Sequence, residues 1–114
     1  MVRSGDGRVV WDSDSYGFLS RTARTRPIPA CGDKGSYAPA RACMPVTDGI
    51  YQVRGLDLSN MTLVEGEQGV IVIDPLISAE TAAAALGLYR GDRRVTAVIY
   101  TQSDADHLGG VQGW

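Results

Sequence analysis

A strand–helix–strand pattern between residues 70 and 100 constrains the fold of this chain more than any other sequence feature. The run Val70–Ile73 is continuous, apolar and β-branched, which is typical of a strand buried on both faces. A helix is expected next, with Ser78 as its N-cap and Gly91 as a stop signal just beyond it. A second buried strand is expected at Val95–Tyr100. A strand, a helix and a strand within about thirty residues predict a βαβ unit, whose two strands lie parallel in one sheet.

The residues before this unit predict further strands of the same sheet. Asp48-Gly49 is a turn signal, and short strands are expected after it at Ile50–Val53 and Met61–Val64. The helix is expected to bury one face, whose members recur at helical spacing: Ala79, Ala82, Ala83, Leu86 and Tyr89. These elements together predict an α/β fold with a mixed sheet and one full helix.

The first part of the chain lacks such regular patterning. Four of the five prolines and both cysteines fall between residues 21 and 47, which predicts an irregular linker. Residues 1–46 are therefore interpreted as a lead-in and linker, and residues 47–114 as the patterned domain. Cys31 and Cys43 have eleven residues between them, a spacing that fits no zinc knuckle. Because no signal segment precedes them, free thiols are expected.

Composition and charge argue against several classes of function. Eleven Lys and Arg residues against thirteen Asp and Glu residues give a net charge of −2, which implies no nucleic-acid partner. The cluster of Arg21, Arg24 and Arg26 is followed at once by prolines and is interpreted as a solvated linker. No run approaches the ~18 apolar residues of a membrane span. No apolar stretch follows the polar N-terminus, so a cytoplasmic location is the default expectation.

The loop after the second parallel strand contains the residues best suited to chemistry. It reads Thr101-Gln102-Ser103-Asp104-Ala105-Asp106-His107-Leu108-Gly109-Gly110 and holds the only histidine of the chain. In α/β sheets, reactive groups gather where the strands end at their carboxyl edge. Asp104, Asp106 and His107 lie within four residues and could converge on one cation, above a tight backbone turn at Gly109-Gly110. Aspartate and histidine also serve as turn formers and caps, so spacing alone leaves both interpretations open.

The order of these elements and the motif T-x-S-x-x-D-H-x-G-G resemble the start of a metallo-β-lactamase-fold hydrolase. The superfamily motif in this loop is H-x-H-x-D-H, which supplies ligands to a two-metal site. Further segments resemble the alkylsulfatase branch, whose members hydrolyse alkyl sulfate esters. These segments are 7–12, 47–55, 57–62, 70–78 and 95–101. The resemblance implies an α/β chain that forms the N-terminal part of an αββα sandwich, a ββ(β)αβ fragment, and two Zn²⁺ ions in the intact enzymes.

The resemblance also implies roles for the residues of the loop. Asp106 and His107 match the Asp and the last His of the motif, so both are expected metal ligands, and Asp106 is the expected catalytic residue that orients the nucleophilic water. Gln102 and Asp104 stand where the first two metal-binding histidines belong. Asp104 can replace its histidine through a carboxylate oxygen, whereas Gln102 offers only a neutral amide oxygen. Replacing imidazoles by oxygen donors shifts selectivity from zinc toward harder cations.

The remaining metal ligands of the family lie C-terminal to this loop, and the chain ends at Trp114. This predicts a truncated alkylsulfatase-like metallo-hydrolase that is inactive or weakly active by itself. Two alternatives stay open. Open sheet edges could pair with a second copy or with a missing C-terminal part, which would make the chain a non-catalytic assembly module. In the second alternative, the sequence comes from a degraded reading frame whose product folds poorly.

Overall fold

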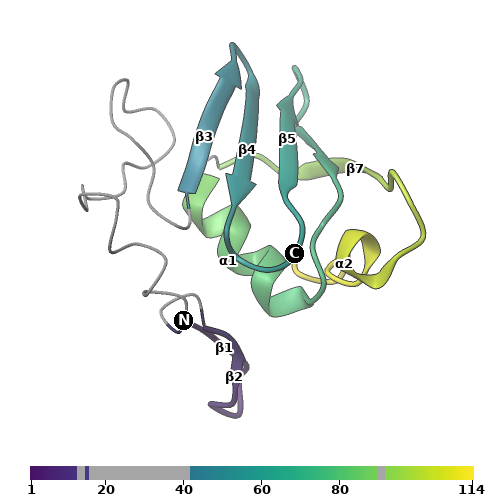
Figure 1. Ribbon diagram of the computed structural model, residues 1–114. Helices are drawn as coiled ribbons and strands as arrows, with labels where there is room; N and C mark the ends of the chain where they lie inside the picture. Colours follow the sequence, from purple (N-terminus) through teal and green to yellow (C-terminus); the bar gives the residue numbers. More distant parts are fainter. Residues whose placement is uncertain (13–14, 16–41, 90–91) are drawn as a thin grey trace.

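The computed structural model describes residues 1–12, 15, 42–89 and 92–114 (Figure 1). The helices and strands are β1 (Val2–Arg3), β2 (Val9–Trp11), β3 (Ala42–Thr47), β4 (Ile50–Arg54), β5 (Met61–Glu65), β6 (Val70–Ile73), α1 (Ala79–Tyr89), β7 (Val95–Ile99) and α2 (Ala105–Leu108). The strands expected between residues 50 and 100 are confirmed to within one residue at each end. Cys31 and the arginine cluster lie outside the described residues. Within the described residues, no helix is long and apolar enough to cross a membrane.

Strands β3 to β7 form one five-stranded sheet in the order β3-β4-β5-β6-β7. Neighbours from β3 to β6 pair antiparallel, whereas β6 and β7 pair parallel and are joined through α1. The βαβ unit and the mixed α/β sheet are therefore confirmed. The turn at Asp48-Gly49 connects β3 to β4, and Gly49 has a φ of 73°, which glycine adopts without steric cost.

The sheet begins earlier than the sequence indicates. Residues 42–46 were expected in the irregular linker, but they belong to β3, which pairs with β4. Pro45 lies opposite Tyr51 in this pair, and a proline is accommodated because β3 is the outermost strand of the sheet among the residues that the structure describes. Cys43 is buried and disulfide-bonded, so the expectation of a free thiol there is wrong.

The hydrophobic core lies between one face of the sheet and α1. Its fully buried side chains come from both layers: Val53, Met61, Leu63, Val70, Val72, Ala82 and Ala85. The expected helix face is only partly correct, because Ala82 and Tyr89 are buried but Ala83 is exposed and Thr81 and Ala85 are buried instead. Ala82 and Ala85 are three residues apart and therefore lie on the same face of α1, which packs against the sheet, whereas Ala83 points away from that face. The Oγ of Ser78 accepts the backbone N–H of Thr81 at 3.2 Å, which confirms the expected N-cap.

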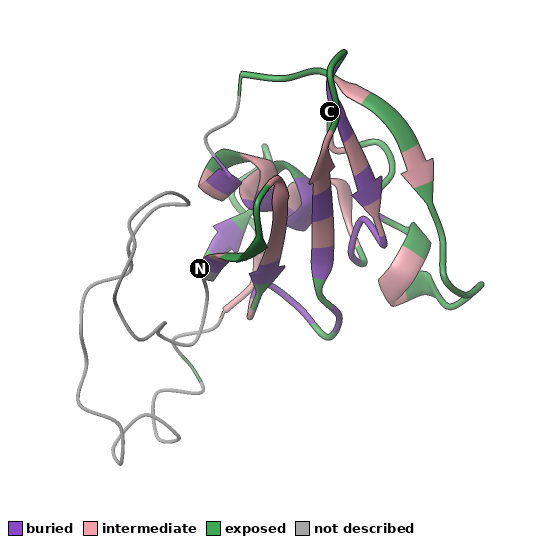
Figure 2. Cartoon of the chain, turned by 90° about the horizontal axis from the view of Figure 1, so that it is seen from above, coloured by how far each residue is buried: buried purple, intermediate pink, exposed green. Residues whose placement is uncertain are grey.

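Two strands are less buried than expected (Figure 2). In β6, Val70 and Val72 are fully buried, but Ile71 and Ile73 on the opposite face are only half-buried. In β7 no residue is fully buried, and Ile99 is 48% exposed. The apolar composition of β7 predicts a buried strand, but in the described part of the chain β7 lies at the edge of the sheet and has β6 as its one neighbour.

Candidate functional site

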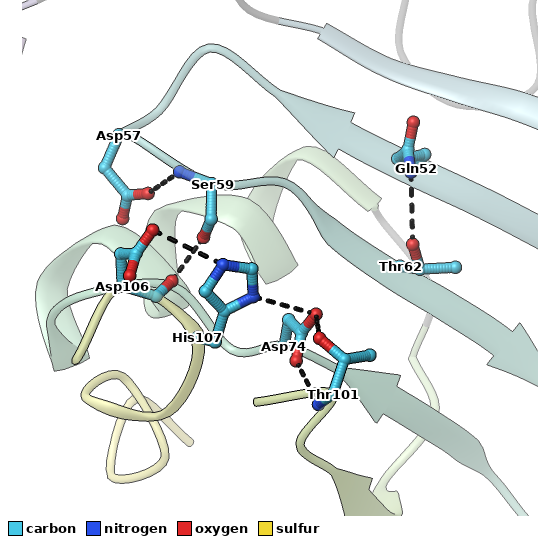
Figure 3. A network of polar contacts seen from close by, with 8 residues as sticks. All are labelled: Gln52, Asp57, Ser59, Thr62, Asp74, Thr101, Asp106 and His107. Carbon is cyan, nitrogen blue, oxygen red and sulfur yellow. Dashed lines mark hydrogen bonds and ion pairs between the residues drawn. The ribbon is translucent and has the colours of Figure 1, made fainter. Parts of the chain in front are cut away.

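The candidate site lies where β6 and β7 end, at the edge of the sheet that the βαβ unit predicts. Asp74 directly follows β6, and Thr101 lies two residues beyond β7. The short helix α2 carries Asp106 and His107, and the ring of His107 lies between the carboxylates of Asp74 and Asp106 (Figure 3). Side chains from three separate segments thus meet at one point.

Asp74 joins these three segments. Its Oδ1 accepts the backbone N–H of Thr101 at 2.8 Å, and its Oδ2 accepts the Thr101 hydroxyl at 2.5 Å. The same Oδ2 lies 3.0 Å from Nδ1 of His107 and forms an ion pair with the protonated ring, although this buried nitrogen makes no hydrogen bond among the described residues. Asp74 has a φ of 55°, in the left-handed region that few residues other than glycine adopt, and Leu76 has a φ of 70°. Backbone strain of this kind persists where the surrounding contacts hold it in place.

The contacts among these groups shift two pKa values in opposite directions. Burial acts to raise the pKa of Asp74, but the hydrogen bonds from Thr101 and the contact with His107 outweigh it and lower the pKa below 3.8. The contact with Asp74 raises the pKa of His107 above 6.5, burial opposes this, and the charges of Asp106 and Asp104 add to the increase. The site therefore favours positive charge at the imidazole position.

The loop between β4 and β5 contacts α2 from the other side. The hydroxyl of Ser59 donates to the backbone carbonyl of Asp106 (Figure 3). Asp57 is buried, and its Oδ1 accepts the backbone N–H of Ser59 while its Oδ2 accepts that of Ile77, each at 3.0 Å. Both side chains thus bridge segments that are distant in the sequence.

Gly109 and Gly110 let the end of α2 lie against the loop between β6 and α1. A Cβ on Gly109 would lie 2.2 Å from the carbonyl oxygen of Ile77, and one on Gly110 would lie 2.0 Å from that of Pro75. The N–H of Gly110 donates to the carbonyl of Leu76 at 2.9 Å. Gly109 has a φ of −64°, so close approach of two backbones, rather than an unusual turn conformation, requires glycine at this position.

Two of the predicted metal ligands have donor atoms close together. Nε2 of His107 lies 3.4 Å from Oδ2 of Asp106. Two ligand atoms that bind tetrahedral zinc at ~2.0–2.1 Å lie ~3.3 Å apart, so this spacing fits two ligands of one cation. Asp74 lies 3.0 Å from the other ring nitrogen, which is where a carboxylate that orients a metal-binding histidine is found. Asp106 and His107 therefore fit one half of a cation site.

The other two predicted positions are arranged differently. Asp104 holds the N-cap position of α2 and is exposed, and Gln102 is exposed in the preceding loop. Among the residues that the structure describes, no group of three His, Cys, Asp or Glu side chains is placed to hold a metal ion. The assignment of Asp104, Asp106 and His107 as ligands therefore stays a prediction.

Four residues of the site were missed by reasoning from the sequence: Asp57, Ser59, Asp74 and Thr101. Asp74 could have been found, because it follows the first strand of the βαβ unit and the carboxyl ends of parallel strands meet at one edge. Asp57 and Ser59 carried no such signal, since they belong to an antiparallel connection distant in sequence from the loop.

Residues 54–114, more than half of the chain, match the sequence model of the metallo-beta-lactamase superfamily. The chain belongs to the metallo-beta-lactamase superfamily. Membership of this superfamily implies dependence on a metal, and the predicted family is confirmed.

The chain is similar to several alkylsulfatases. It is 46% identical to a linear primary-alkylsulfatase from Pseudomonas sp, over 98% of this chain and 17% of the relative. It is 44% identical to the alkyl/aryl-sulfatase BDS1 of Saccharomyces cerevisiae, over 95% of this chain and 17% of the relative. The structure of the stereoselective inverting sec-alkylsulfatase Pisa1 from Pseudomonas sp. superimposes with a TM-score of 0.76 at 37% identity, over 98% of this chain and 18% of that one. This metallo-beta-lactamase chain thus spans less than one fifth of the length of these relatives.

Proposed function

We propose that this chain supplies part of the cation site of an alkyl sulfate ester hydrolase, with Asp106 and His107 as ligands of one cation and Asp104 as a further ligand. The observation that carries the proposal is the 3.4 Å separation of Nε2 of His107 and Oδ2 of Asp106, with Asp74 3.0 Å from the other ring nitrogen. The similarity to alkylsulfatases supports alkyl sulfates as the substrate class, and membership of the metallo-beta-lactamase superfamily supports a bound metal, which we propose is Zn²⁺.

A bound divalent cation would supply Lewis-acid chemistry, which lowers the pKa of a water molecule and neutralises charge on the sulfate oxygens. The residues of this chain hold and orient the donors. Asp74 lies 3.0 Å from Nδ1 of His107, and Nε2 on the other side of the ring lies 3.4 Å from Asp106. Asp106 is the residue we assign to orienting the water that attacks the ester, a reaction that yields an alcohol and hydrogen sulfate.

We further propose that the 114-residue chain does not turn over alkyl sulfates by itself. The described residues bring two donor atoms together, whereas a two-metal mechanism needs enough ligands for a pair of cations. In assays with octyl sulfate and added Zn²⁺ or Mn²⁺, we expect sulfate release equal to that of a protein-free control. Robust metal-dependent release would contradict this part of the proposal.

Cation binding is testable without activity, because His107 is the only histidine and gives a single set of imidazole resonances. We expect Mn²⁺ to broaden the ring resonances of His107 through paramagnetic relaxation. Asp106→Asn should raise the Mn²⁺ concentration needed for this effect by about tenfold or more, since altering even the residues that orient metal ligands costs at least that much affinity. Asp48→Asn is the matched control, because it removes the same charge from an exposed turn at the opposite end of the sheet. Equal broadening in both variants would argue against Asp106 as a ligand.

A second candidate function, assembly through an open sheet edge, is favoured by β7. Among the described strands, β7 pairs only with β6, and Ile99 and Tyr100 are 48% and 47% exposed. An exposed apolar edge strand is a template for another chain. We expect size-exclusion chromatography with light scattering to show self-association at high concentration. A stable monomer with cooperative thermal unfolding would count against both this function and a poorly folded product.

A further inference from the structure

We propose that Asp57 and Ser59 are positioning residues for α2, and that they set the placement of Asp106 and His107; this inference rests on the proposed function for its catalytic meaning. Neither residue carries a donor atom of the candidate site. They act through the backbone, because Ser59 donates to the carbonyl of Asp106 and Asp57 fixes the backbone of Ser59.

The helix α2 cannot be fixed by apolar packing. It has four residues and no buried side chain. A helix of this length is unstable by itself, since it forms too few internal hydrogen bonds to offset the cost of nucleation. Its position therefore depends on the polar contacts that hold it, which are those of Ser59, of the Gly110 N–H with the Leu76 carbonyl at 2.9 Å, and of His107 with Asp74 at 3.0 Å.

In residues 57–59 the polar side chains are buried and the apolar one is exposed, which is the reverse of the usual pattern. Asp57 and Ser59 are each 7% exposed, whereas Leu58 between them is 75% exposed. Burying two polar groups and exposing a leucine is unfavourable unless the polar groups form hydrogen bonds that offset their desolvation. Those hydrogen bonds run to the loop after β6, through the N–H of Ile77 at 3.0 Å, and to α2. The segment 57–59 thus connects the two backbone segments that frame the candidate site.

The test uses the complete chain and measures amide hydrogen exchange in Ser59→Ala. The backbone N–H groups of His107 and Gly110 are both hydrogen-bonded, at 2.9 Å, so their exchange reports opening of α2. We expect exchange at both amides to accelerate about tenfold, the effect of losing one part-buried hydrogen bond. The amides of Leu63 and Val72 in the sheet should keep their wild-type rates, because a positioning role is local.

Ser103→Ala is the matched control, because Ser103 is exposed in the loop that leads to α2. It should leave the exchange of His107 and Gly110 unchanged. Exchange in Ser59→Ala that stays within twofold of wild type, or that accelerates equally in the sheet, would overturn the proposal. Should Ser59→Ala fail to fold, Asp57→Asn gives the second measurement, since it removes one of the two acceptor oxygens and is expected to accelerate the same two amides.

A cation readout separates this inference from the proposed function. We expect the concentration of Mn²⁺ needed to broaden His107 to rise about tenfold in Ser59→Ala and to stay unchanged in Ser103→Ala. If Mn²⁺ does not broaden His107 in the wild-type chain, the proposed function fails, while the exchange rates still decide whether Ser59 positions α2. If Mn²⁺ binds wild type and Ser59→Ala equally, the proposed function stands, and the claim that Ser59 sets the placement of Asp106 and His107 is wrong.

Discussion

Gly110→Ala is expected to destabilise the chain by about 3 kcal/mol, at the upper end of the usual cost of overpacking. A Cβ at this position would lie 2.0 Å from the carbonyl oxygen of Pro75, 2.8 Å from that of Ser78 and 2.9 Å from the Cβ of Ala82. These neighbours are backbone atoms and a core helix residue, which cannot move aside as the end of a flexible side chain can. The expected consequence is displacement of α2 from the loop between β6 and α1. Urea unfolding followed by circular dichroism measures the effect.

Gly87→Ala provides the matched control. Gly87 lies within α1, is exposed, and has no atom within 4 Å of the position that a Cβ would occupy. The same substitution there is expected to stabilise the chain by ~0.5–1 kcal/mol, because alanine is a better helix former than glycine. Opposite signs for the two variants would establish close approach as the reason for Gly110. A Gly110→Ala variant as stable as wild type would show that α2 does not contact this loop in solution.

Asp74→Ala is expected to cost about 3 kcal/mol or more, because two hydrogen bonds to a charged group are lost, each of which contributes ~1.5–3 kcal/mol. Both come from Thr101, to Oδ1 and Oδ2. Alanine also adopts the φ of 55° at this position less readily than aspartate does. Asp74→Asn is the conservative comparison, since asparagine tolerates this conformation and keeps one acceptor oxygen, but has no charge. Its loss of stability should be smaller.

Removing the charge of Asp74 is also expected to change the pKa of His107. Because the contact with Asp74 is the main cause of the raised pKa of His107, this pKa should fall in Asp74→Asn. A titration of the single histidine by NMR measures it directly. An unchanged pKa of His107 in Asp74→Asn would mean that the Asp74–His107 contact is absent in solution.

The pH dependence of stability follows from the directions in which the fold shifts the pKa values of His107 and Asp74. The raised pKa of His107 means that its protonated ring stabilises the fold fully below the unfolded value of ~6.5, and that this contribution is lost as pH rises through the folded value. The lowered pKa of Asp74 means that its contribution is present above ~3.9 and lost as pH falls through the folded value. The stability difference between wild type and Asp74→Asn should thus be larger near pH 5.5 than at about pH 9.

Reasoning from the sequence found the central βαβ unit because its signals are local. The β-branched run at Val70–Ile73, the Ser78 cap and the alanine-rich helix act within a few residues of one another, and the structure confirms the strand, the cap and the helix, although not the full burial expected of the strand and of the helix face. The same reasoning failed for β7 and β3, because the burial and pairing of these strands depend on parts of the chain that are distant in the sequence. β7 has the composition of a buried strand but lies at the sheet edge, and β3 lies in a segment whose prolines predicted a linker.

The sequence by itself determined the family, the order of the elements and the loop that holds Asp106 and His107, because motif spacing and hydrophobic periodicity are properties of neighbouring residues. Only the tertiary structure decided which atoms face one another. The contacts of Asp74 with His107 and of Ser59 with Asp106 join residues 33 and 47 positions apart. Such contacts arise from the pairing of strands and the packing of loops, so the side chains that orient the candidate site leave no local pattern in the sequence.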